Sequence, residues 1–172
     1  RRVSRWFLQY SHNKGSLLEM KILKAQATVG ALLLATIGLT GCATTVTLDP
    51  APLANDPNCA EVIVRLPELV GDQSERPTNA QATAAWGDPA SVLLRCGLEP
   101  VLVSDLPCVT AGGVDWLVDE SEKPSYRFIS FARTPGTEIN VDSNTISGIT
   151  ALEALGPAVQ NIEASKTCTA AE

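Results

Sequence analysis

The pattern of apolar and polar residues divides the chain into one long apolar run near the N-terminus and a longer part in which short apolar segments alternate with turns. The run covers residues 25–40, and Lys21 and Lys24 precede it. A short basic region followed by about 7–15 apolar residues is typical of a secretory signal peptide, and such a run is too short to cross a bilayer comfortably. The pattern therefore predicts an exported protein.

The end of the apolar run predicts a covalent lipid. Residues 39–42 read Leu-Thr-Gly-Cys, and small residues directly before a cysteine allow an extended chain to enter a signal peptidase. We therefore expect cleavage before Cys42 and acylation of the protein at this residue, with palmitate among the acyl chains. The alternative is an ordinary signal peptide that a cysteine follows by coincidence. Because Met20 is the only methionine, we expect residues 20–41 to be the signal peptide and residues 1–19 to be an upstream segment outside the native protein.

Residues 42–56 are rich in proline and small residues. We expect them to form a lipidated tether to a single globular domain of residues 57–170. As an alternative, residues 46–48 within this segment pair as an edge strand.

Short segments with β-branched or aromatic residues dominate the middle of the domain. Turn residues separate them, and the Gly112–Gly113 pair between two such runs is typical of a tight hairpin turn. We therefore expect strands at residues 82–86, 92–96, 114–118, 127–133 and 138–141.

Helical signals flank these strands. Asp56 and Pro57 are typical of an N-cap and a first helical turn, and they predict a helix to about Leu66. We expect Ser143 or Asn144 to cap a last helix, and Gly156 and Pro157 to kink it or divide it into two. The buried stripe of this helix is expected to be Ile146, Ile149, Leu152, Leu155, Val159 and Ile162. This order predicts an α+β fold: an antiparallel sheet of about four to five strands with the N- and C-terminal helices packed on one face.

The expected mature chain is strongly acidic. The whole sequence has 13 Lys and Arg against 19 Asp and Glu, and the 41 residues before Cys42 hold six of the former and one of the latter. The remaining 131 residues therefore carry a net charge near −11. An acidic surface repels nucleic acid and anionic lipid headgroups, so we expect no nucleic-acid partner and a membrane attachment that depends on the lipid anchor.

The expected mature chain contains no histidine, because His12 is the only one in the sequence. This excludes Ser–His–Asp and Cys–His catalysis, histidine-ligated zinc and an imidazole pH switch in the mature protein. We expect no cofactor and no bound metal.

Four cysteines remain once Cys42 carries lipid, and an even number in an exported chain predicts two disulfides. Cys96 and Cys108 bracket a short loop with Gly97 and two prolines, so we expect them to join across a hairpin. That leaves Cys59 and Cys168, near the two ends of the domain, as the second pair. A zinc site of four thiolates is the alternative, but the chain has no Cys-x-x-Cys pair.

Several segments together resemble one protein family. They are residues 49–52 (DPAP), 81–89 (QATAAWGDP), 94–97 (LRCG) and 113–118 (GVDWLV), with Cys42, Cys108, Arg127 and Phe128. In these segments the chain resembles, over residues 42–168, the actinobacterial lipoproteins described as domain of unknown function 3515. The resemblance implies a lipid-anchored protein of the cell envelope, and it implies no activity.

Five residues are candidates for ligand contact. Trp86 and Trp116 could form a binding platform for a sugar ring or peptide, although core packing is the expected role of aromatic residues in a small domain. Asp88 and Asp115 could bind a ligand or act as carboxylate catalysts, although acidic turns and runs usually form a solvated surface. Arg95 could reach an anion, and the same holds for Arg127 outside this set, although pairing with a nearby carboxylate is the expected role of both.

Two functions from different classes are compatible with these residues. The first is a non-enzymatic binding or accessory module on the extracytoplasmic face of the cell membrane, whose partner is an envelope protein, peptidoglycan or a lipid-linked molecule. The second is a carboxylate-dependent hydrolase that acts on cell-envelope glycan. We expect the first, since no catalytic residue can be assigned. A shallow surface would favour the binding module, and a deep pocket with two convergent carboxylates would favour the hydrolase.

Overall fold

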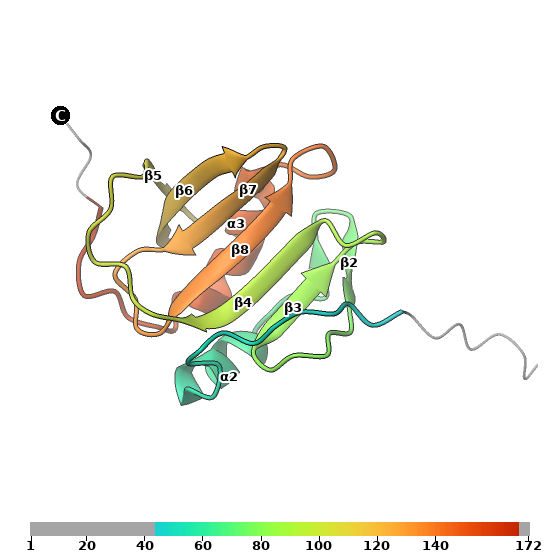
Figure 1. Ribbon diagram of the computed structural model, residues 1–172, viewed down its shortest axis with the longest axis horizontal. Helices are drawn as coiled ribbons and strands as arrows, with labels where there is room; N and C mark the ends of the chain where they lie inside the picture. Colours follow the sequence, from blue (N-terminus) through green and yellow to red (C-terminus); the bar gives the residue numbers. More distant parts are fainter. Residues whose placement is uncertain (1–43, 169–172) are drawn as a thin grey trace, which may run out of the picture. The chain divides into compact units, whose positions relative to one another are not determined.

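The computed structural model describes residues 44–168; the expected upstream segment, the signal peptide and Cys42 lie outside this range. Its strands form one antiparallel sheet in the order β1-β2-β3-β4-β8-β7-β6-β5 (Figure 1). The strands are β1 (Leu69–Val70), β2 (Gln73–Arg76), β3 (Thr83–Trp86), β4 (Val92–Leu98), β5 (Cys108–Ala111), β6 (Val114–Glu122), β7 (Ser125–Ser130) and β8 (Gly136–Asp142). Helix α2 (Pro57–Ile63) precedes them and helix α3 (Gly148–Val159) follows. Neither of these helices has the length and hydropathy of a membrane span.

The predicted fold class is wrong. The sheet has eight strands instead of four or five, and the helices have only 7 and 12 residues, so the described part is mostly β. All five predicted strands are present, as β3, β4, β6, β7 and β8. The three missed strands are short and lie toward the edges of the sheet. The sequence of β2, Gln-Ser-Glu-Arg, contains no apolar residue and so has no alternation to detect.

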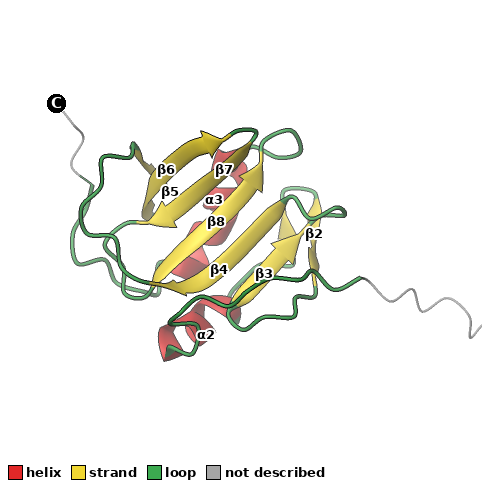
Figure 2. Ribbon diagram, in the orientation of Figure 1, coloured by secondary structure: helices red, strands yellow, loops and turns green. Residues whose placement is uncertain are grey.

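One face of the sheet forms the main core together with both helices. On β4, Val92, Leu94 and Cys96 are fully buried in the core cluster to which both helices contribute, and α3 lies behind the sheet in Figure 2. From α3, Leu152 and Leu155 complete this layer. Burial of one such aliphatic side chain contributes about 1.5–3 kcal/mol. Because strand side chains alternate, every second residue of β4 and β8 is left on the other face.

The helix ends agree only in part with the predictions. The Asp56 cap is confirmed, because the Asn58 amide donates to its carboxylate at 2.8 Å. The predicted cap at Ser143 or Asn144 is wrong, since Ser147 caps α3 and the two earlier residues follow β8 in a turn held by Asp142. Helix α3 is one continuous helix that contains Pro157, and Ile149 is 54% exposed instead of lying in the buried stripe.

The Gly112–Gly113 turn joins β5 to β6, as predicted. Both glycines have positive φ, +56° and +71°, which a two-residue hairpin of type I′ requires. Helix α3 packs directly on this turn: a Cβ added at Gly156 would lie 2.7 Å from the Cα of Gly112. Glycine is therefore needed on both sides of this contact.

The four cysteines form two disulfides, as predicted, but the predicted pairing is wrong. Cys59 on α2 joins Cys96 on β4, with their Cα atoms 5.6 Å apart, and Cys108 joins Cys168 at 6.4 Å. The hairpin expected between Cys96 and Cys108 does not form, because β4 pairs with β3 and β8 whereas β5 lies at the far edge of the sheet. The first disulfide ties α2 to the sheet, and the second ties the C-terminal segment to β5.

Terminal segments cover part of the second face of the sheet. In the N-terminal segment, residues 44–55, Val46 forms a bridge with Thr78 and the Leu53 amide donates to the Gly97 carbonyl at 2.8 Å. The described part of the expected tether is thus packed on the domain. Near the other end, Cys168 packs against a second, smaller core of Leu117, Ile129, Phe131 and Ala132. Between the two segments lies an accessible strip of β4, β8 and β7.

Candidate functional site

Three charged side chains meet on this accessible strip. Arg95 on β4, Glu138 on β8 and Arg127 on β7 come from three neighbouring strands. Nε and Nη2 of Arg95 contact Oε1 of Glu138 at 2.7 and 2.6 Å, and the same atoms of Arg127 both contact Oε2 at 2.7 Å. We call this arrangement the Arg–Glu–Arg triad.

The Glu138 carboxylate is fully committed to the triad. Its side chain is only 4% exposed, whereas those of Arg95 and Arg127 are 35% and 40% exposed. Each carboxylate oxygen accepts two guanidinium contacts, so Glu138 is poorly placed to act as a general acid or base. Each arginine uses Nε and Nη2 inwardly, and among the described residues no partner contacts either Nη1. The outer edges of two guanidinium groups are therefore available to a ligand.

The triad has more cations than carboxylates, unlike the other ion pairs in residues 44–168. Arg65 pairs with Glu61, Arg76 with Asp88 and Lys123 with Glu120. The two remaining basic side chains contact backbone carbonyls: Arg133 that of Ile162, and Lys166 that of Leu102. Among the ion pairs of the described residues, the triad is therefore the one in which the cations outnumber the carboxylate that they share.

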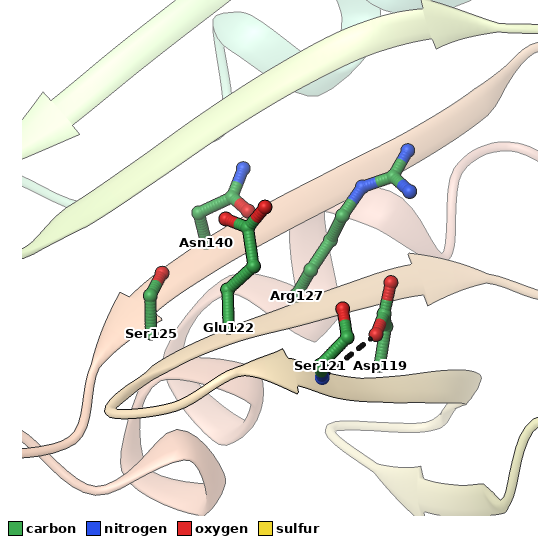
Figure 3. Close-up of a pocket in the computed structure, with 6 residues that line it drawn as sticks. All are labelled: Asp119, Ser121, Glu122, Ser125, Arg127 and Asn140. Atoms are coloured by element: carbon green, nitrogen blue, oxygen red, sulfur yellow. Dashed lines mark hydrogen bonds between the residues drawn. The ribbon is translucent and has the colours of Figure 1, made fainter.

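Two shallow hollows adjoin the triad. The first, of about 280 Å³, lies under the N-terminal segment and is lined by Thr47, Leu48, Asp49, Leu93, Leu94, Arg95, Glu138 and Asn140. The second, of about 140 Å³, is lined by Asp119, Ser121, Glu122, Ser125, Arg127 and Asn140 (Figure 3). Asn140 belongs to both linings. The two hollows are therefore adjacent, and both are smaller than the roughly 300–1,000 Å³ of a typical small-molecule pocket.

Asp119 is held in its ionised form. The hydroxyl of Ser121 and its backbone amide, which donates to Asp119 Oδ1 at 3.0 Å, keep the pKa of this carboxyl below its usual value, and the nearby Arg127 acts in the same direction. Asp119 and Arg127 are cross-strand partners in the β6–β7 register, yet they do not form an ion pair. A negative and a positive group thus face the same hollow without neutralising each other directly.

The two predicted aromatic contacts are core residues. Trp86 and Trp116 are both 0% exposed. Their indole N–H groups donate to the carbonyls of Pro67 and Ala111, each at 3.0 Å. The expected core role is thus confirmed, and neither tryptophan can form a binding platform on the surface.

The two predicted aspartates lie outside the strip. Asp88 is exposed and pairs with Arg76 at 2.9 Å. Asp115 accepts from the Thr110 hydroxyl at 2.6 Å and from the Cys168 amide at 2.8 Å, so it holds the C-terminal segment in place. Of the five predicted contact residues, only Arg95 belongs to the candidate site. Within residues 44–168, no group of three or more His, Cys, Asp or Glu side chains is placed to hold a metal ion.

Of the other residues of the site, Arg127 was named as a possible anion contact, whereas Glu138 and Asn140 were not predicted as contacts. Glu138 and Asn140 alternate with the buried Ile139 and Val141 on β8, so alternation alone indicated that they share the face opposite the core. Their proximity to Arg95 and Arg127 depends on β8 lying between β4 and β7. That strand order is not visible in the local sequence.

Comparison with known proteins places the chain in a family without an assigned activity. A family model described as "Protein of unknown function (DUF3515)" matches residues 23–167. The match covers most of the chain and confirms the family resemblance of the sequence motifs. Neither a curated protein nor a solved structure shows significant similarity.

Proposed function

We propose, from the premise that this chain belongs to the DUF3515 family, that it is a lipoprotein anchored on the extracytoplasmic face of the cell membrane. In this proposal it acts as a non-enzymatic module that binds a component of the cell envelope. The binding surface is the strip around the Arg–Glu–Arg triad.

The extracytoplasmic location is supported by two independent features. The first is the Leu-Thr-Gly-Cys sequence that ends at Cys42 after an apolar run. The second is the pair of disulfides, Cys59–Cys96 and Cys108–Cys168. Structural disulfides persist in oxidising compartments and are rare in the cytosol, so they favour export of the domain.

The binding role rests on the way in which Glu138 is engaged. A catalytic carboxylate needs a free oxygen to donate or accept a proton, and both oxygens of Glu138 are occupied by arginines. The outward guanidinium edges can recognise a carboxylate or phosphate in a two-point geometry. The shallow hollows on either side suit contact with part of a larger molecule.

The alternative, a glycan hydrolase, is supported by the presence of Asp119 and Glu122 in one hollow. However, a general acid in such an enzyme needs a raised pKa, and the pKa of Asp119 is lowered by its bonds to Ser121. Asp119 is therefore unsuited to be that acid, and together with the shallow hollows this favours binding without turnover.

Substitution of Cys42 by alanine should move the protein from the membrane fraction into the soluble fraction or leave an unprocessed precursor. Each buried CH₂ of an acyl chain contributes about 0.8 kcal/mol to membrane affinity, so multiple chains make release negligible on the scale of the experiment. Fractionation followed by intact mass spectrometry measures both location and acylation. A membrane-bound Cys42→Ala variant, or a wild-type protein without acyl chains on Cys42, would show that this part of the proposal is wrong.

The purified full chain should bind insoluble peptidoglycan or isolated envelopes without hydrolysing them. Arg127→Gln should reduce the bound fraction about tenfold, because it removes one free guanidinium edge. Arg65→Gln is the matched control: it makes the same change of charge just after α2, where Arg65 is paired with Glu61 of the helix, and it should bind as the wild type does. Turnover of envelope glycan that Asp119→Asn or Glu122→Gln abolishes would instead establish the hydrolase.

A further inference from the structure

The second hollow is lined by groups of both charges, so a ligand that carries only a positive or only a negative charge would not match it. Arg127 carries a positive charge, and the carboxylates of Asp119 and Glu122 line the same space. In Figure 3 the Glu122 carboxylate extends toward Asn140, whereas Asp119 and Ser121 lie at the other end of the group. A simple anion would be attracted by Arg127 but repelled by the two carboxylates that line the same hollow.

A metal cation is equally poorly matched. Arg127 would repel it, and no group of three metal-ligating side chains exists in residues 44–168. The ligand that complements this hollow carries both charges close together, with the anion toward the guanidinium and the cation toward the carboxylates.

The polar groups around the charges match the same kind of ligand. Ser121, Ser125 and Asn140 supply hydroxyl and amide groups that can donate to a carboxylate or accept from an ammonium. The volume of about 140 Å³ equals that of about five water molecules at roughly 30 Å³ each, which is room for a small organic group.

We propose that this hollow binds an α-amino acid group, in which a carboxylate and an ammonium are attached to one carbon. The carboxylate contacts the outer edge of Arg127, and the ammonium lies beside the Glu122 carboxylate, with Asp119 at the other end of the hollow. This inference rests on the proposed function, because it names the chemistry that the strip recognises in the envelope.

The adjacent hollow indicates where the rest of a larger ligand lies. This is the first hollow: it shares Asn140 with the second, and it combines the apolar side chains of Leu48 and Leu93 with Arg95. A branched envelope peptide that ends in a free amino acid group would place that group at Arg127 and its chain over Leu48 and Leu93. A free amino acid would occupy the second hollow alone.

Calorimetric titration of the full chain tests this inference with glycine, acetate, ethylammonium, inorganic phosphate and soluble peptidoglycan fragments. Glycine should bind at least tenfold more tightly than acetate or ethylammonium, because only glycine satisfies both charges. Soluble fragments that compete with glycine and bind more tightly would identify the peptide as the source, and binding of glycine alone would identify the free amino acid. Both outcomes support an amino acid site.

Glu122→Gln is the decisive variant, because the Glu122 side chain is exposed and makes no hydrogen bond or ion pair with the described residues, so its substitution leaves the fold intact. It should weaken glycine binding about tenfold, whereas Glu153→Gln, an exposed position on α3 behind the sheet, should leave it unchanged. Acetate or phosphate binding as tightly as glycine, with no effect of Glu122→Gln, would overturn the inference in favour of a simple anion site. If ethylammonium binds, and Arg127→Gln does not change its affinity, the inference would be overturned in favour of a cation site.

The two proposals can fail separately. If no small molecule binds, but the chain still binds peptidoglycan in a manner that depends on Arg127, the amino acid inference is wrong and the proposed binding function stands. If neither small molecules nor envelopes bind, both are wrong.

Discussion

A variant in which Cys59 and Cys96 are both alanine should lose about 4 kcal/mol of unfolding free energy, the value that the chain-entropy model gives for a closed loop of this length. The two residues are 37 positions apart, so their link removes much of the freedom of the unfolded chain. Both side chains are 0% exposed, so their truncation also loses packing in the main core. Urea denaturation measures the loss, because buried Trp86 and Trp116 report unfolding through their fluorescence.

The control for this variant is Val64→Ala, next to α2 but 75% exposed, which should change stability by no more than about 0.5 kcal/mol. Non-reducing peptide mapping of the double variant should still recover Cys108 joined to Cys168. A loss below about 1 kcal/mol, or a Cys108 that is free after the substitutions, would contradict the pairing described above.

Replacement of both triad arginines, Arg95→Met with Arg127→Met, should lower the free energy of unfolding by about 3 kcal/mol. Removal of the partners of a buried charge typically costs about 3–5 kcal/mol, and the lower end applies because both guanidiniums are more than one third exposed. Glu138 would then be a nearly buried carboxylate without its cations. Addition of Glu138→Leu should recover most of the loss, because an apolar side chain of similar size needs no partner.

The charge-matched control is Arg65→Met with Lys123→Met. Both residues form exposed ion pairs, which typically contribute about 0–1 kcal/mol each. If the triple variant, Arg95→Met with Arg127→Met and Glu138→Leu, stays as unstable as the double arginine variant, the triad is needed for the fold. A triple variant that is stable but no longer binds envelopes would assign the triad to binding, which is the result that the proposed function requires.

Local patterns were sufficient for the central strands and one cap. The strands β4, β6 and β8 have alternating or continuous apolar residues because they lie inside the sheet, with one face in the core. The edge strand β5 and the polar strand β2 are held by backbone hydrogen bonds to their neighbours, and such bonds leave no mark on the side-chain pattern. The sheet was therefore predicted with too few strands, and the fold class was wrong.

The disulfides likewise could be predicted in number from the sequence, but not in pairing. The even number of cysteines after Cys42 was enough to predict two disulfides, but any pairing depends on which Cα atoms come within about 7 Å. Proximity in sequence suggested Cys96 and Cys108. The structure separates them because β8, β7 and β6 lie between β4 and β5 in the sheet.

The sequence by itself determined the side-chain chemistry of this protein: the Leu-Thr-Gly-Cys sequence that ends at Cys42, the excess of acidic residues, the absence of histidine after His12, and the arginines in strand-like segments. Only the tertiary structure decided which of these groups meet. Arg95 and Glu138 are 43 residues apart, and they form a triad with Arg127 because β8 pairs with both β4 and β7. Strand order is set by the packing of the whole core. The residues around a charged position on a strand therefore do not indicate which side chain will lie beside it on the neighbouring strand.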